Sequence, residues 1–185
     1  MEPSNDVPRD TNVTVRCCAV VSSKGQEVLN CQYTIFKDRV QVYTKTTTSS
    51  EDLLYPLPMA RAFNSGKYTC QIDIEGKREV SPYQKLTVTG LSKPELHLNK
   101  AVVNEGEEVT ARCTAPGETG SIIFYFYDNS KEIKEEQVSS NYAETKFRFT
   151  SIGYHKFHCA YTVVVVVDGF RSEQSNIITV SVKGM

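Results

Sequence analysis

The sequence predicts an all-β protein made of two tandem β-sandwich domains. Short segments alternate between apolar and polar residues with a period of two, turn residues separate them at regular intervals, and helical periodicity is absent. Three strand motifs occur in one half and recur in the same order in the other, which indicates one structural unit used twice. The matched segments are residues 13–17 and 109–113, 67–70 and 156–159, and 86–88 and 178–180.

Each repeated unit has the size of an immunoglobulin domain, roughly 100 residues, and carries two cysteines on separate predicted strands. We therefore expect immunoglobulin-like sandwiches of the C2/I type. The expected boundaries are residues 1–89 for the first domain, a short linker at 90–94 that contains Gly90 and Pro94, and residues 95–185 for the second domain.

Alternation predicts the individual strands. In the first domain they cover residues 12–18, 31–36, 40–43, 53–57, 67–74 and 80–88, with a Thr- and Ser-rich loop at 44–51. In the second they cover residues 109–113, 121–128, 145–150, 156–167 and 172–182, and the charged segment 131–140 is expected to be a solvated connection.

Six cysteines are an even count, and two pairs sit at similar separations in the two repeats. We expect the disulfides Cys17–Cys70 and Cys113–Cys159, which place the chain in an oxidising compartment. The alternative is a set of buried thiols in a cytosolic protein.

Cys18 and Cys31 remain. They flank a short loop, and a third bridge between them is the natural pairing, although two unpaired thiols, or one used between chains, are also compatible with the sequence.

Two features of the sequence predict how each core is packed: the residue at the tyrosine corner and the residue that replaces the usual core tryptophan. Tyr68 lies two residues before Cys70, the tyrosine-corner position, whereas Phe157 occupies this position in the second domain, so packing alone is expected to hold that corner. Tryptophan is absent, and we expect Tyr33 or Ile35, and Phe124, to take the usual place of the core tryptophan.

Composition excludes several partners. The net charge is −1 and like charges do not cluster, so we expect no nucleic-acid binding. Asn12 begins an N-x-Ser/Thr sequon and is the expected glycan acceptor. The sequence has no leader-like apolar region and no apolar run of about 20 residues. We expect an excerpt from the extracellular side of the plasma membrane, with the membrane anchor outside it.

Catalysis finds no support in the sequence. His97, His155 and His158 are the only histidines, and the last two fall on opposite faces of one strand, so they cannot chelate one metal ion. Nucleophile-elbow and phosphate-binding glycine motifs are absent. We expect neither enzymatic activity nor a cofactor.

One surface has the composition of a protein-binding site. Strand phase places five apolar or aromatic residues of the second domain on the sheet face opposite the core, and such patches mark protein contacts. The alternatives are that another strand or domain covers the patch, or that the valines reflect β propensity alone. The residues are Ile123, Tyr125, Tyr127, Val164 and Val166.

Several motifs carry a resemblance to a known family. They are the tryptophan-free segment 33–43, the Asn-Ser-Gly-Lys-Tyr-Thr-Cys run at 64–70, the domain start at 92–96 followed by Glu105-Gly106, and the ending at 172–180. Together they resemble the two N-terminal immunoglobulin-like domains of the platelet endothelial cell adhesion molecule family, among the Fc-receptor-like leukocyte receptors. Two features depart from that pattern: Cys18 and Cys31 are additional cysteines, and Asn64 stands where the family has aspartate.

The resemblance implies cell–cell adhesion by homophilic binding in trans through the two N-terminal domains. The alternative is an Fc-receptor-like or other immune receptor that binds a heterologous cell-surface or immunoglobulin protein; the absence of tryptophan disfavours it, because such sites usually use exposed tryptophans.

Overall fold

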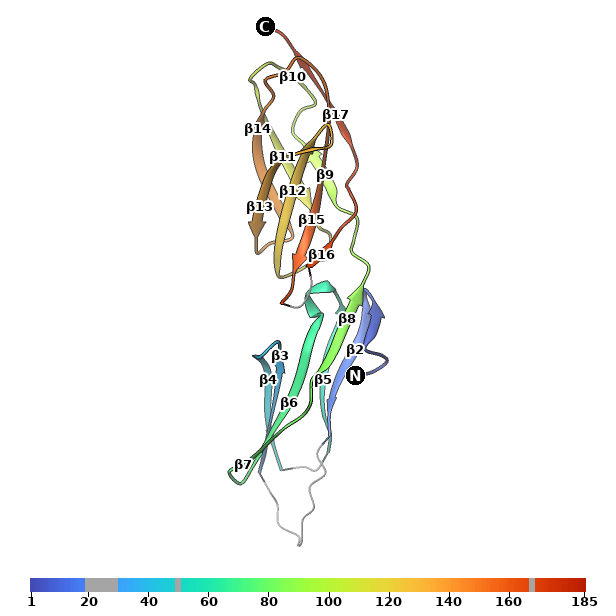
Figure 1. The fold of residues 1–185 in the computed structure, drawn as a ribbon, viewed down its shortest axis with the longest axis vertical. Coiled ribbons are helices and arrows are strands. Elements are labelled where there is room, and N and C mark those ends of the chain that lie inside the picture. The colour runs from blue at the N-terminus through green and yellow to red at the C-terminus, as the bar shows by residue number, and fades with distance from the viewer. Residues whose placement is uncertain (19–29, 49–50, 167–168) are drawn as a thin grey trace. The chain divides into compact units, whose positions relative to one another are not determined.

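The chain divides into two compact units, Met1–Gly90 and Leu91–Met185. The computed structural model describes residues 1–18, 30–48, 51–166 and 169–185 (Figure 1). Within these residues the regular secondary structure consists of strands and one short 3₁₀ turn, η1, joined by turns and loops. The prediction of two tandem immunoglobulin-like β-sandwiches is confirmed.

The first unit contains a larger and a smaller sheet. The larger sheet has the strand order β1-β8-β6-β3-β4, with β7 beside β6, and β1 runs parallel to β8; the smaller sheet pairs β2 with β5. The elements are β1 Asp6–Pro8, β2 Thr11–Cys17, β3 Cys31–Lys37, β4 Val40–Thr47, β5 Leu53–Ala60, η1 Ala62–Asn64, β6 Gly66–Ile74, β7 Lys77–Val80 and β8 Gln84–Thr89.

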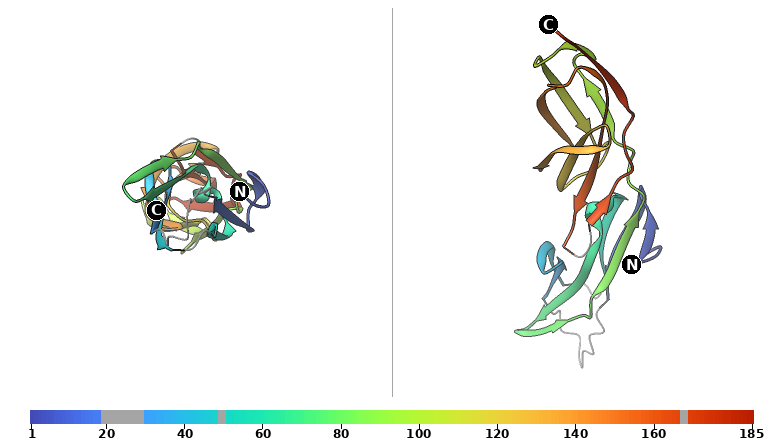
Figure 2. Two further views of the ribbon diagram at one scale, coloured as in Figure 1. Left: turned by 90° about the horizontal axis from the view of Figure 1, so that it is seen from below. Right: turned by 45° about the horizontal axis from the view of Figure 1, so that its top comes forward.

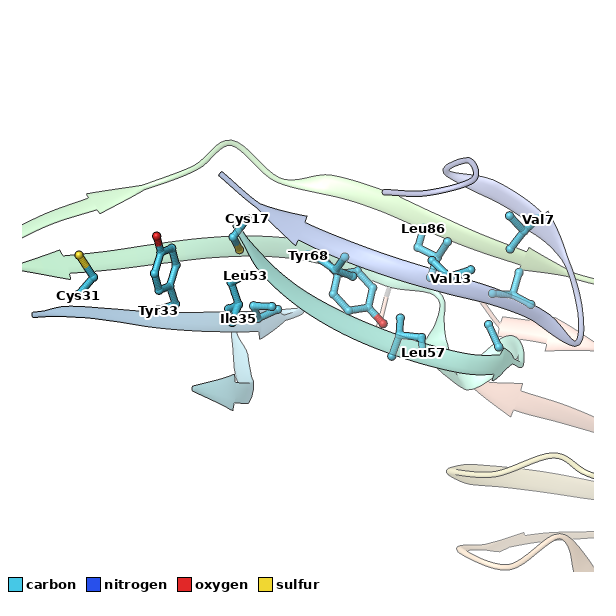
Figure 3. Close-up of a cluster of buried hydrophobic side chains, with 13 residues drawn as sticks. Val7, Val13, Cys17, Cys31, Tyr33, Ile35, Leu53, Leu57, Tyr68 and Leu86 are labelled. Atoms are coloured by element: carbon cyan, nitrogen blue, oxygen red, sulfur yellow. The ribbon is translucent and has the colours of Figure 1, made fainter. Parts of the chain in front are cut away.

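Alternate residues of these strands form the core, because successive side chains of a strand point to opposite faces of its sheet. Val13, Val15 and Cys17 of β2 are buried, as are Tyr33 and Ile35 of β3. Figure 3 shows side chains from both sheets pointing into one shared interior. Ile35 is paired with Cys70 in the sheet and therefore lies beside the disulfide, where a tryptophan is usual.

The disulfide Cys17–Cys70 joins the two sheets across 53 residues of sequence. The third predicted bridge, Cys18–Cys31, is absent from the disulfides of the described residues. Cys18 follows the inward-facing Cys17 and is exposed, whereas Cys31 is buried in the core. Strand alternation thus turns the two side chains to different environments. The intervening residues 19–29 lie outside the described residues.

Tyr68 makes the hydrogen bond expected of a tyrosine corner. Its buried hydroxyl donates to the Asn64 carbonyl oxygen at 2.6 Å, which ties β6 to the turn that precedes it. Burial raises the pKa of this phenol well above its usual range, so the hydroxyl remains a donor.

The second unit repeats the plan with two sheets (Figure 2). The sheet that we call the front sheet has the order β10-β17-β15-β12-β13, with β16 beside β15; the other sheet has the order β14-β11-β9. The strands are β9 Glu95–Leu98, β10 Val102–Asn104, β11 Glu108–Thr114, β12 Ser121–Asp128, β13 Lys131–Val138, β14 Tyr142–Arg148, β15 Gly153–Val164, β16 Gly169–Arg171 and β17 Ile178–Lys183.

Two segments expected to be loops form strands instead. Residues 131–138 pair with β12 as β13, and β4 continues through Thr47, into the loop predicted at 44–51, of which residues 49 and 50 lie outside the described residues. Both β4 and β13 are edge strands. Their solvent-facing residues need no apolar alternation, so backbone pairing forms a strand that the sequence pattern does not reveal.

Aromatic rings fill the interior of the second unit. Phe157 is fully buried, with its ring centroid 5.0 Å from that of Phe147 and 5.8 Å from that of Phe149. Phe126 is paired with Cys159, beside the disulfide Cys113–Cys159. The predicted Phe124 lies one inward-facing position away and is also fully buried, with its ring 6.0 Å from that of Tyr161.

Packing is not the only interaction that holds the corner of the second unit. His155 Nε2 lies 2.8 Å from the Ser151 carbonyl oxygen, and Nδ1 lies 2.7 Å from Asp128 Oδ2. Like Tyr68 in the first unit, His155 bonds the backbone of the residue four positions earlier. Burial lowers the pKa of His155, but the Ser151 carbonyl and the Asp128 carboxylate outweigh burial, so the net shift raises the pKa.

This arrangement predicts a pH-dependent contribution of His155 to stability. Because its folded-state pKa is raised, the contribution is complete below the unfolded-state pKa of about 6.5 and is lost as the pH rises through the folded-state value. We expect His155→Gln to lower the free energy of unfolding by on the order of 1 kcal/mol more at pH 6 than at pH 8. Urea denaturation at both pH values measures this difference.

The exposed His97 on β9 provides the matched control, since His97→Gln should cost little at either pH. His158 has a pKa lowered by burial and an opposite pH dependence, but it is present in every variant and cancels in the comparison. An equal cost of His155→Gln at both pH values would contradict the charged hydrogen bond.

Candidate protein-binding face

The outward face of the front sheet carries the aromatic residues that strand phase predicted. Ile122, Phe124 and Phe126 of β12 are fully buried, so Ile123 and Tyr125 point away from the core. Tyr127 continues this outward row. The three outward side chains are half-buried by their neighbours in the sheet.

Cross-strand pairing shows which neighbours share this face. On β15, Tyr125 is paired with Ala160 and Tyr127 with His158, while Val164 lies at the end of the same outward row, opposite Ser121. Val164 is 37% exposed. Val166 is 81% exposed but lies beyond the end of β15, so the sheet does not place it on the face. The structure therefore brings four of the five predicted residues together.

Arg171 is a member of this face that strand phase alone did not reveal. It lies on β16, and its guanidinium sits 4.3 Å from the ring centroid of Tyr125. The guanidinium also donates a hydrogen bond to the hydroxyl of Tyr127. A cation over an aromatic face adds attraction beyond packing, so one side chain holds both tyrosines in place.

His158 is the second addition. Its ring stacks on that of Tyr127 with centroids 4.8 Å apart and planes 7° from parallel. Burial lowers the pKa of His158, so the ring is neutral at physiological pH. Burial also raises the pKa of Tyr127, although the charge of Arg171 opposes that shift. The stacked rings of Tyr127 and His158 are thus neutral, whereas the Arg171 guanidinium beside them is charged.

Charged side chains lie beside and over these aromatic rings. On β13, Glu135 is paired with Tyr125 and Glu132 with Tyr127, and both carboxylates are exposed. Two cations share this face: the Arg171 guanidinium lies over Tyr125, and the exposed Lys156 lies on β15. We call the surface formed by Ile123, Tyr125, Tyr127, His158, Val164 and Arg171 the aromatic face.

The corresponding face of the first unit is mostly polar along β3 and β6, although it includes the half-buried Phe36 and the exposed Val80. Gln32 and Thr34 of β3 face outward there, paired with Asp73 and Gln71 of β6. Asp73 accepts hydrogen bonds from Gln71 at 2.8 Å and from Arg78 at 2.7 Å. The two units share a fold but expose different chemistry, so the aromatic face is not a general consequence of the sandwich.

Asn12, the predicted glycan acceptor, is exposed near the start of β2. Its side-chain oxygen accepts a hydrogen bond from the Met59 backbone nitrogen at 2.9 Å. Among the described residues, no group of three or more histidine, cysteine, aspartate or glutamate side chains is placed to hold a metal ion. In the same part of the chain, no helix has the length and hydropathy needed to span a bilayer.

Sequence comparison finds several curated relatives, although no protein-family model matches the chain. Platelet endothelial cell adhesion molecule from Mus musculus is 28% identical over 149 residues, which cover 80% of this chain and 19% of the relative. The Rattus norvegicus protein is 30% identical over 122 residues, which cover 66% and 18%. The Bos taurus protein is 26% identical over 188 residues, which cover 96% and 25%. The chain thus spans a quarter or less of the length of these relatives.

Solved structures were also compared. The human OSCAR ligand-binding domain is 20% identical with a TM-score of 0.45, covering 97% of this chain and 95% of its own. An ICAM-5 D1–D4 ectodomain fragment is 13% identical with a TM-score of 0.46, covering 100% and 52%. Repeated cysteine strands, sandwich topology and sequence similarity agree: the chain has tandem immunoglobulin-like domains and, over most of its own length, resembles part of platelet endothelial cell adhesion molecule.

Proposed function

We propose that the chain is part of the extracellular region of a cell-surface adhesion receptor and that it binds a second copy of itself. The observation that carries this proposal is the aromatic face, where Tyr125, Tyr127 and Arg171 are held together on an outward sheet surface. Tyrosine and arginine are among the residues most enriched at the energetic centres of protein interfaces. The adhesion role is supported by the names of the relatives.

The two disulfides suit an oxidising, extracellular setting, and a membrane anchor is proposed to lie outside this chain. Single adhesion contacts are often weak and act through many copies, so self-association must be measured both in solution and at high surface density. Sedimentation velocity across a concentration series and aggregation of beads that display the chain meet both needs. Concentration-dependent dimers or bead aggregation support homophilic binding. Monomers together with dispersed beads would reject it and favour a receptor for a heterologous protein.

Replacing Tyr125 with serine is expected to weaken self-association by about tenfold or more, because a central tyrosine anchor contributes about 2 kcal/mol to an interface. The side chain lies on the outward face, so the domain should still fold. Bead aggregation and sedimentation measure the loss, and thermal unfolding followed by circular dichroism checks the fold.

Tyr142 is a matched control for this substitution. It lies on β14 of the other sheet, is 40% exposed, and also has an arginine, Arg112, over its ring at 4.1 Å. Tyr142→Ser should leave self-association unchanged. Equal behaviour of the two serine variants would remove the aromatic face from the proposed binding site.

A further inference from the structure

We infer that an N-linked glycan on Asn12 covers an apolar strip on the outward face of β5 in the first unit. We define this apolar strip by its four residues, Leu54, Pro56, Pro58 and Met59. The inference rests on the extracellular placement proposed above, and it concerns a surface other than the aromatic face.

The apolar strip departs from the usual composition of a strand with one solvated face. The residues of β5 that face the core are apolar, as expected, but the four residues of the strip are exposed and apolar as well. Leu54 is 50% exposed and Met59 is 61% exposed. Strands of antiparallel sheets normally place polar residues on the solvent side, so this composition indicates that another group covers the strip.

Asn12 lies directly across the sheet from one end of the strip. The pairing of β2 with β5 contains a β-bulge between Thr11 and Val13, where one residue of β2, Asn12, faces two residues of β5, Pro58 and Met59. The strip ends four residues farther along β5, about 13 Å away at roughly 3.3 Å per residue. A glycan of several sugars on Asn12 can span this length.

The hydrogen bond at the bulge orients the Asn12 side chain. Its Oδ1 accepts from the Met59 backbone nitrogen at 2.9 Å. The contact distinguishes the two amide atoms, because Nδ2 is itself a donor and cannot accept from a backbone N–H. Since Oδ1 is held toward the backbone of β5, Nδ2 projects from the other side of the carboxamide. Nδ2 is the atom that carries an N-linked glycan, so the fold leaves the acceptor atom outside this hydrogen bond.

The second unit contains the same strand pair without a sequon. The repeat places Glu108 at the position of Asn12, an offset of 96 residues (108−12). Glu108 forms ion pairs with Lys146 at 2.8 Å and with Arg148 at 3.0 Å, both on the paired strand β14. The outward residues of β14 are mainly charged, whereas those of β5 are apolar. The apolar strip therefore accompanies the sequon and is not a general consequence of the fold.

A glycan explains why these two features occur together. Glycans are bulky and solubilising, so sugars attached to Asn12 shield the neighbouring apolar side chains and present hydroxyl groups to water. An uncovered apolar strip would favour association with other proteins. Attachment at the end of the strip also obstructs the approach of a protein partner, which favours the glycan as its cover.

Secretion of the full chain from cultured eukaryotic cells tests the modification. We expect the intact mass to exceed that of the polypeptide and to fall after treatment with peptide-N-glycosidase F. Asn12→Asp should lack the added mass, whereas Thr14→Ser, which preserves the sequon, should retain it. A wild-type chain without added mass would overturn the inference. Homophilic binding would be unaffected by that result, because sedimentation velocity measures it separately.

Methionine oxidation tests whether the glycan covers the strip. Met59 lies in the strip, and the fully exposed Met185 is an internal reference. Chloramine-T converts exposed methionine to its sulfoxide, and peptide mass spectrometry measures the sulfoxide at each position. We expect the oxidation rate of Met59, relative to that of Met185, to rise several-fold when the glycan is removed from the folded chain. An unchanged ratio would show that the glycan projects away from the strip and would overturn the inference.

Enzymatic removal of the glycan also controls for the hydrogen bond at the bulge. The enzyme leaves aspartate at position 12, and its carboxylate can still accept from the Met59 backbone nitrogen. A rise in Met59 oxidation therefore reports the loss of sugar and not the loss of this bond. The treated chain is already folded, so the test does not depend on the folding of Asn12→Asp.

Leu54→Thr distinguishes a glycan-covered strip from a protein interface. Threonine is polar and suits a strand, and the replaced side chain is exposed, so the unit should still fold. In the glycosylated chain this variant should self-associate as the wild type does, whereas after glycan removal it should aggregate less than the wild type. Loss of self-association in the glycosylated variant would identify the strip as a protein interface and overturn the inference.

Discussion

Replacing both Cys113 and Cys159 with alanine is expected to lower the free energy of unfolding of the second unit by about 4 kcal/mol. The disulfide closes a sequence separation of 46 residues, and both cysteines are fully buried. Most of the expected loss comes from the greater conformational entropy of the unfolded chain, which a loop of this length restricts strongly when it is closed. A small domain has few other means to replace that contribution.

Urea denaturation of the full chain followed by far-ultraviolet circular dichroism measures the effect, with the first unit as an internal reference. Cys18→Ser is the control, because Cys18 is exposed and forms no disulfide. Its cost should stay within about 0.5 kcal/mol. A loss below about 1 kcal/mol in the double alanine variant would show that packing, and not the disulfide, stabilises the second unit.

Phe157→Ala is the second substitution with a large expected effect. Phe157 is fully buried, and its ring contacts those of Phe126, Phe147 and Phe149. Truncation removes apolar burial and leaves a cavity between rings on two sheets that cannot easily collapse. We expect the free energy of unfolding of the second unit to fall by about 3–5 kcal/mol.

Phe63 provides a comparison on the surface of the first unit, where it is 41% exposed. Phe63→Ala should cost far less, within about 1 kcal/mol, although its ring lies 5.1 Å from the Lys37 ammonium. Phe157→Leu should fall between the two alanine variants, since leucine refills part of the cavity. Equal effects of Phe157→Ala and Phe63→Ala would contradict the aromatic core described above.

The aromatic face could be predicted from the sequence only in part. Alternation along β12 assigns Tyr125 and Tyr127 to the outward face, because that assignment needs nothing beyond the period of a single strand. Arg171 and Tyr127, which share a hydrogen bond, are 44 residues apart in the sequence. Its place over the tyrosines depends on the pairing of β16 with β15 and of β15 with β12, which no single strand contains. The outward placement of Glu132 and Glu135 could not be predicted, because their segment has no apolar alternation that would identify it as a strand.

The same distinction applies to the fold. Local periodicity and repeated spacing in the sequence encode the two-fold repeat, the inward-facing cysteines Cys17 and Cys113, and the tyrosine corner at Tyr68, so each could be predicted. Tertiary pairing, by contrast, is needed to form the edge strands β4 and β13, the bond from His155 to Ser151, and the register that joins Arg171 to the aromatic face. These features depend on which backbone groups pair across the sheets, and a one-residue change in register would turn every side chain of a strand to the opposite face.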